Sequence, residues 1–170
     1  MALGSVAEWV TASIAAGALY VAWTELGAVR KTASADFIHR LKDDFFTPEA
    51  TSIIQLLSEK HLKFIEAVDN PYFVTANNSR FSVFEFDRHV MLPLENLGAL
   101  AHRGLVDIEL AYEFFAWHVD LVWENEAVRA YVGWTRSDPS DADYFCCLES
   151  LNAAFATCER TGKHTCRVQK

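Results

Sequence analysis

The sequence predicts an all-α protein, in which an N-terminal apolar helix is followed by an antiparallel bundle of about five to six helices. Apolar residues recur at helical spacing through most of the chain, and no segment alternates apolar and polar residues for long enough to form a sheet. The longest uncharged run lies near the N-terminus. At 170 residues the chain has room for one domain and one additional element.

The composition excludes several classes of protein. With 51% apolar and 22% charged residues, the chain is neither disordered, collagen-like nor of low complexity. Its formal charge of -8 and its pI near 5.2 leave no general basic surface for phosphate groups. We therefore expect no nucleic-acid partner.

The first predicted element is an apolar anchor helix within residues 1–31. The segment from Trp9 to Thr24 has 16 residues without a charge, and 12 of them are apolar. As a helix it is about 24 Å long, against about 30 Å for the hydrocarbon core of a bilayer. Residues 6–7 and 26–29 lengthen the apolar segment if Glu8 and Glu25 lie at the two interfaces.

The flanks of this helix indicate an orientation. Trp9 near one end, with Tyr20 and Trp23 near the other, resembles the aromatic belt of a membrane span. Arg30 and Lys31 follow directly, whereas the first eight residues contain no Lys or Arg. The positive-inside rule then places the N-terminus outside and the remaining chain in the cytoplasm. Without a basic leading segment, a cleaved signal peptide is not expected.

A soluble alternative stays open for the same helix. Many of its apolar residues are alanine, so that its hydropathy is modest, and apolar runs of this length also occur as core helices. In that case residues 9–24 form a long docking helix of a soluble cytoplasmic protein.

Residues 32–170 are predicted to form a helical bundle domain with a basic tail. Ser34 is expected to cap a helix over residues 34–46, whose apolar stripe is Phe37, Ile38, Leu41 and Phe45. Thr47 and Pro48 are expected to start the next helix, which runs to about Val68. Residues 69–71 end that helix, and the stretch to Arg80 is a loop or a partial helix.

The second half of the domain is also expected to be helical. Helical periodicity resumes over residues 82–102, with Pro93 as a kink or a new start and Gly104 as a C-cap. Asp107 is expected to cap a further helix. The remaining expected elements are a helix around residues 128–134, a turn-rich linker over 137–143 and a last helix over 143–159.

One face of the helix that follows Asp107 is acidic. Its four carboxylates lie within about 60° of one another on a helical wheel: Glu109, Glu113, Asp120 and Glu124. This face is either a solvated surface over an ordinary core or a docking surface for a basic partner. The segment from Arg160 to Lys170 holds four basic residues and no acid, which suits pairing with this face or contact with anionic lipid.

Sequence signatures of enzymes are absent, and candidate metal ligands are few. The chain has no phosphate-binding glycine loop, nucleophile elbow or zincin motif. A di-iron bundle needs repeated Glu-x-x-His motifs, whereas here Asp36-x-x-His39 and Glu85-x-x-x-His89 occur once each. His118 lies at the centre of the apolar face of its helix, which is typical of a core histidine. An alternative function is a bundle enzyme or sensor that holds a metal or small ligand near Glu85, His89 and His118.

All four cysteines lie near the C-terminus, at Cys146, Cys147, Cys158 and Cys166. No CxxC motif occurs, and neighbouring side chains on a helix point in different directions, so that we expect buried structural thiols instead of a zinc site. In a cytoplasmic domain the thiols stay reduced. The opposite membrane orientation would make a Cys158–Cys166 disulfide plausible.

Several short strings resemble an uncharacterised bacterial family of short proteins with a domain of unknown function. These strings are Ala35-Asp-Phe-Ile-His-Arg-Leu41, Phe46-Thr-Pro-Glu49, Leu94-Glu-Asn-Leu-Gly-Ala-Leu100, Gly104-Leu-Val-Asp107 and Val128-Arg-Ala-Tyr-Val-Gly-Trp-Thr-Arg136. The resemblance covers about residues 5–136 and implies an N-terminal apolar helix, an all-helical domain and a single-span or peripheral membrane protein of bacterial type, located at the bacterial inner membrane. It implies no activity and no catalytic residue.

The function expected from these observations is that of a membrane-anchored helical protein without enzymatic activity or a cofactor. Such a protein binds other proteins, as an accessory subunit of a membrane complex or by self-association. The anchor residues, the acidic face and the missing catalytic motifs all favour this interpretation.

Overall fold

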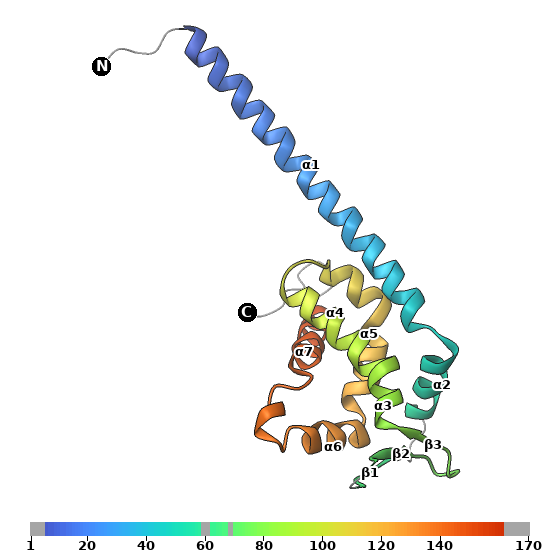
Figure 1. Ribbon diagram of the computed structural model, residues 1–170. Helices are drawn as coiled ribbons and strands as arrows, with labels where there is room; N and C mark the ends of the chain where they lie inside the picture. The colour runs from blue at the N-terminus through green and yellow to red at the C-terminus, as the bar shows by residue number, and fades with distance from the viewer. Residues whose placement is uncertain (1–5, 59–61, 68–69, 162–170) are drawn as a thin grey trace.

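The computed structural model describes residues 6–58, 62–67 and 70–161. One long helix extends away from a domain of shorter helices that also contains a small sheet (Figure 1). The first half contains α1 (Val6–Phe45), α2 (Pro48–Leu57), β1 (Lys63–Ile65), β2 (Tyr72–Val74), β3 (Arg80–Ser82) and α3 (Val83–Phe86). The second half contains the π-helix η1 (Asp87–Met91), α4 (Leu92–His102), α5 (Ile108–Glu124), α6 (Glu126–Thr135), the 3₁₀ helix η2 (Pro139–Asp141) and α7 (Cys146–Thr161). Helices dominate the described chain, which confirms the predicted all-α class.

The predicted boundary between an anchor helix and a capped helix at Ser34 is wrong. Helix α1 continues through this position, and Ser34 is a buried residue in its interior. The Ser34 hydroxyl oxygen accepts a hydrogen bond from the backbone N–H of Asp107 at 2.7 Å. Together with the buried side chains of Ile38 and Phe45, this bond fixes the C-terminal part of α1 to the domain.

Local capping signals determine most of the other helix boundaries. The Thr47 hydroxyl accepts from the N–H of Ala50, and the Asp107 carboxylate accepts from the N–H groups of Glu109 and Leu110, as predicted. Gly104 follows α4 with a φ of +68°, which only glycine adopts without strain. Side-chain and backbone caps of this kind depend on adjacent residues alone, so they are readable from sequence.

The segment between α2 and α3 forms a sheet that the sequence did not predict. Helix α2 ends at Leu57 instead of near Val68, and the described part of the segment contains three antiparallel strands in the order β1-β2-β3. Phe73 in the central strand pairs with Phe64 on one side and Phe81 on the other, and it is fully buried. Each strand has only three residues, so that no alternation is long enough to be detected.

Pro93 marks a change of helical register in the middle of the domain. It lies in the first turn of α4, directly after the π-helix η1, where the N–H of Leu92 bonds to the carbonyl of Asp87. Proline has no N–H to donate to the preceding turn, so a local widening to π geometry lets the helix continue. The predicted kink or restart at Pro93 is therefore observed as a π segment.

The core lies where α4, α5 and α7 meet. Helices α4 and α7 make the most extensive contact, and Gly98 of α4 lies directly against the carbonyl of Cys147. Helix α5 buries Ala111, Phe115, Val119 and Val122 in this core.

Candidate functional site

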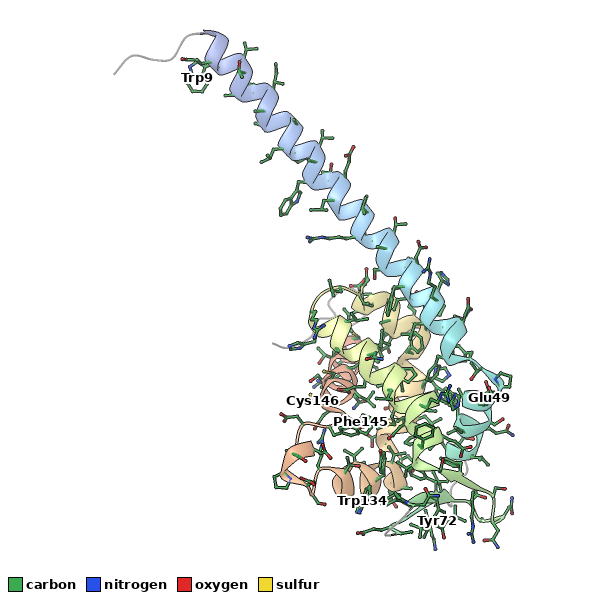
Figure 2. The ribbon with its side chains drawn as sticks, in the orientation of Figure 1. Trp9, Glu49, Tyr72, Trp134, Phe145 and Cys146 are labelled. Carbon is green, nitrogen blue, oxygen red and sulfur yellow. The ribbon has the colours of Figure 1, made fainter. Side chains whose placement is uncertain are left out.

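The most unusual surface of the molecule is the free part of α1. Every residue from 8 to 33 is exposed, although the segment is rich in apolar residues. Trp9 lies near the far end, away from the domain (Figure 2). The large apolar side chains that this segment exposes are Trp9, Val10, Ile14, Leu19, Tyr20, Val21, Trp23, Leu26 and Val29, and Leu19 and Trp23 are each 77% exposed. We call residues 8–33 the apolar shaft.

The apolar shaft belongs to the one helix in the described chain that is long and apolar enough to cross a membrane. The segment Glu8–Asp43 contains an 18-residue window with a mean hydropathy of 1.3, and none of that window is buried. A core helix of a soluble protein passes the same length and composition criterion, but it buries its apolar side chains against its own domain. Here, by contrast, every residue from 8 to 33 is exposed, and most of the shaft extends away from the domain (Figure 1).

A basic hollow lies where the apolar shaft meets the domain. Arg30 and Lys31 of α1 line a cavity of about 440 Å³ together with Arg103 and the loop that joins α4 to α5. Leu105 in that loop is 61% exposed. Asp107 is the acidic residue of the lining, and its carboxylate caps α5. The hollow therefore combines three cations with a protruding leucine at the base of the shaft.

The predicted acidic face is present on α5. Glu113, Asp120 and Glu124 are exposed, whereas Glu109 is half-buried. Glu124 forms an ion pair with Arg129 at 3.7 Å between its Oε2 and the guanidinium. Asp120 and Glu124 also line a groove of about 370 Å³ between α5 and α7, whose other walls include Tyr112, Trp117, Asn152, Phe155 and Glu159. The acidic face thus borders a partly aromatic groove.

Among the described residues, the three residues of the alternative ligand site do not form a cluster of metal ligands. Glu85 serves as the N3 residue of a capping box, where its carboxylate accepts hydrogen bonds from the backbone N–H and the hydroxyl of Ser82, both at 2.9 Å. These hydrogen bonds lower the pKa of Glu85. In the described parts of the chain, Glu85, His89 and His118 are not a group of ligand atoms that converge on one point. A metal site made of these three residues is therefore not present in the described chain.

His118 also departs from its predicted position. The buried face of α5 is centred near Phe115 and Val119, so that His118 lies at the edge of the core and is half-buried. Its ring packs edge-on against Phe46, with ring centroids 4.8 Å apart, beside an apolar cavity of about 330 Å³. Burial lowers the pKa of His118, which favours the neutral imidazole.

A converging group that the sequence did not predict consists of Glu95, Cys146 and Cys147. Their ligand atoms all lie within 4.8 Å of one another, which is close enough for the three residues to bind one metal ion. The two sulfur atoms are 3.9 Å apart, so the expectation that these neighbours diverge is wrong. Burial, followed by the charge of Glu95, raises the pKa of the Cys147 thiol to about 12. Figure 2 labels Cys146 and Phe145 where α7 begins.

The cysteines are not all reduced. Cys146 and Cys147 are free thiols, whereas the buried Cys158 is disulfide-bonded. This state contradicts the expectation of reduced structural thiols for Cys158. The pairing considered from sequence, Cys158–Cys166, involves a residue outside the described part of the chain.

A buried polar pair connects η1 to α6. The Tyr131 hydroxyl donates a hydrogen bond to Asp87 Oδ2 at 2.7 Å. Asp87 Oδ1 is buried without a hydrogen-bond partner in the described chain, and burial raises the pKa of Asp87 to about 6. Burial and the neighbouring Asp87 also raise the pKa of Tyr131. The two residues are 44 positions apart, so no local sequence pattern reveals the pair.

Comparison with known proteins provides no relative that could assign a role to these sites. No family model matches the chain, and it shows no significant similarity to a curated protein or a solved structure.

Proposed function

We propose that this chain is a non-enzymatic, membrane-anchored protein that holds a helical domain at a bilayer surface and binds a protein partner there. The observation that carries the proposal is the apolar shaft, which exposes large apolar side chains along its whole length. Each such side chain gains about 1.5–3 kcal/mol when it leaves water. Lipid supplies that environment on all sides of a helix at once.

The lengths of the segments fit a short span. The uncharged run from Trp9 to Thr24 covers about 24 Å, which is shorter than the hydrocarbon core of about 30 Å. Glu25 therefore lies close to the lipid headgroups. The difference in length is met by local thinning of the bilayer or by glutamate side chains that extend toward the headgroups. Arg30 and Lys31 then lie among the lipid phosphates. The basic hollow lies at the same depth as these phosphates, and Arg103 adds a third cation there. The exposed side chain of Leu105 can enter the boundary of the acyl chains.

We propose an orientation with the N-terminus outside and the domain in the cytoplasm. Arg30 and Lys31 support it, because the positive-inside rule weighs basic residues that lie next to a span. The disulfide-bonded Cys158 favours the opposite side, since disulfides persist in oxidising compartments. Labelling of an introduced cysteine at the exposed position Ser140 with a membrane-impermeant maleimide, in intact cells and after lysis, distinguishes the two orientations.

Charges placed in the middle of the shaft are expected to release the protein from membranes. Each lysine at the centre of a span costs about 2.5–3.5 kcal/mol, so the double variant Ala16→Lys/Leu19→Lys loses about 5–7 kcal/mol of insertion free energy. Both positions are exposed, so the domain itself is unaffected. The measurement is the fraction of full-length protein that remains in the membrane pellet after alkaline carbonate extraction.

The matched control is Thr32→Lys/Ala33→Lys, which adds the same charge at exposed positions beyond Arg30 and Lys31. This variant is expected to stay in the pellet like the wild type. A wild-type protein that is soluble without detergent would contradict the anchor, and the soluble alternative would then apply.

The partner is proposed to bind the acidic face of α5 and the adjoining groove. Neutralising two exposed carboxylates, in the variant Asp120→Asn/Glu124→Gln, is expected to reduce crosslinking to a partner with a basic surface at least about tenfold, because complementary charges steer association. The measurement is quantitative mass spectrometry of crosslinked products from native membranes.

The control for this experiment is Asp141→Asn/Asp143→Asn, which removes the same charge from exposed positions between α6 and α7. Equal losses in both variants would show that net charge matters instead of this face. Products that contain only a second copy of the chain would assign the face to self-association.

A further inference from the structure

We propose that Cys146, Cys147 and Glu95 form a binding site for a zinc ion. The spacing of the two sulfur atoms is the first reason. They are 3.9 Å apart, and two thiolates that bind a tetrahedral zinc ion at about 2.3 Å lie about 3.8 Å from each other. The two ligands therefore have the spacing that the ion requires without a rearrangement of the helix.

The third ligand is held in place by the backbone of α7. Glu95 Oε1 accepts a hydrogen bond from the N–H of Cys147 at 3.1 Å, and Oε2 accepts from the N–H of Leu148 at 2.6 Å. A carboxylate oxygen that accepts one hydrogen bond keeps further lone-pair capacity for a cation. The same hydrogen bonds fix the position of Glu95 relative to both cysteines before an ion arrives, as second-shell contacts do in known metal sites.

Close packing of α4 and α7 brings the carboxylate to the thiols. Gly98 lies one turn after Glu95 on α4 and touches the carbonyl of Cys147, so that a side chain there would hold the two helices apart. Phe145 precedes the pair with a φ of +61°, and this left-handed residue directs the chain into the first turn of α7. Both thiols therefore lie at the start of the helix, on the side that faces α4.

The donor set indicates the ion and the type of site. Thiolate sulfur together with carboxylate oxygen is a zinc ligand set, whereas magnesium and calcium prefer oxygen alone. Zn²⁺ displaces the thiol protons when it binds, and the dication then neutralises the charge of the resulting thiolates beside Glu95. Cys146 is exposed, so an ion can enter from solvent and keep a water molecule as its fourth ligand. Such an open site exchanges its ion more readily than a closed four-residue site.

Cobalt titration of the metal-stripped full-length protein in detergent, with the disulfide of Cys158 left intact, tests the site. We expect one Co²⁺ per chain, a sulfur-to-metal charge-transfer band and displacement of that band by Zn²⁺. The double variant Cys146→Ser/Cys147→Ser is expected to lose the band. Glu95→Gln keeps an acceptor for the α7 N–H groups but removes the charge of a direct ligand, and we expect it to weaken binding at least about tenfold.

The matched control is Glu149→Gln, which removes an exposed carboxylate from the first turn of the same helix. Its affinity should equal that of the wild type. A charge-transfer band that persists in the double cysteine variant would overturn the proposal, because other groups would then bind the ion.

A second measurement uses the unaltered protein and does not depend on the folding of variants. Zn²⁺ is expected to slow alkylation of Cys146 and Cys147 at least about tenfold, as read from modified peptides by mass spectrometry. Equal alkylation rates with and without Zn²⁺ would overturn the site. The result is independent of membrane attachment, because the three ligands all lie in the helical domain.

Discussion

Replacing Gly98 with alanine is expected to destabilise the domain by about 3 kcal/mol, at the upper end of the usual cost of overpacking. The added methyl group would overlap the carbonyl of Cys147, and it would also lie 3.2 Å from the backbone nitrogen of Leu148. These are backbone atoms of α7, so no side-chain rotation can relieve the overlap. Urea denaturation followed by circular dichroism measures the change in the free energy of unfolding.

Gly133→Ala is the matched control for this prediction. Gly133 lies in α6, and a methyl group added there meets no atom within 4 Å. Alanine also loses less backbone entropy on folding, so this variant is expected to gain about 0.4–1 kcal/mol. Equal effects of the two substitutions would show that helix propensity, and not the α4–α7 contact, decides the outcome.

The variant Asp87→Asn is expected to change stability in a pH-dependent way, by up to about 3 kcal/mol. Burial raises the pKa of Asp87 from its ordinary 3.8 to about 6. As pH rises from about 4 to about 6, the unfolded chain releases this proton before the folded protein does. The wild type therefore loses stability across this window, whereas asparagine has no proton to release. Relative to the wild type, Asp87→Asn should gain stability between pH 4 and pH 7.

Tyr131→Phe tests the cause of this pH dependence. The Tyr131 hydroxyl donates to the carboxylate and thereby lowers the pKa of Asp87, opposing the effect of burial. Without that donor, the pKa of Asp87 should rise further, and the loss of stability should shift to higher pH. Urea titrations at intervals between pH 4 and pH 8 report the shift for each variant. A difference between wild type and Asp87→Asn that is constant with pH would contradict the buried carboxylate.

The structural features that could be predicted from the sequence are those that depend on neighbouring residues. Thr47, Pro93, Gly104 and Asp107 each act within one helical turn, and each has the predicted effect on a helix boundary. The small sheet could not be predicted, because its strands are short and Phe73 is held by pairing with two other strands. The hydrogen bond by which Ser34 joins α1 to the domain could not be predicted either, since its partner Asp107 lies 73 residues away.

The same distinction between neighbouring and distant residues applies to the candidate sites. The apolar shaft was predicted from a contiguous run of residues, and the structure leaves that run exposed. A helical wheel gives the wrong directions for the cysteine pair, because it describes the middle of a helix, whereas Cys146 is the first residue of α7. No sequence pattern connects Glu95 with the cysteines, since 51 positions separate it from Cys146 and only tertiary packing brings them together.

Because α1 is continuous, any movement of the proposed membrane segment would be passed directly to the domain. The helix has no break between Val6 and Phe45, and its last turns are fixed in the domain by Ser34, Ile38 and Phe45. About 22 Å of helix separates Arg30 from Phe45, so, if the shaft spans a bilayer as proposed, a tilt of about 20° would displace the Phe45 end by about 8 Å. A rotation of the membrane segment about its own axis would likewise turn the acidic face of α5 toward or away from a neighbour. Bilayer thickness and lateral contacts of the shaft would thereby set the direction in which the domain points.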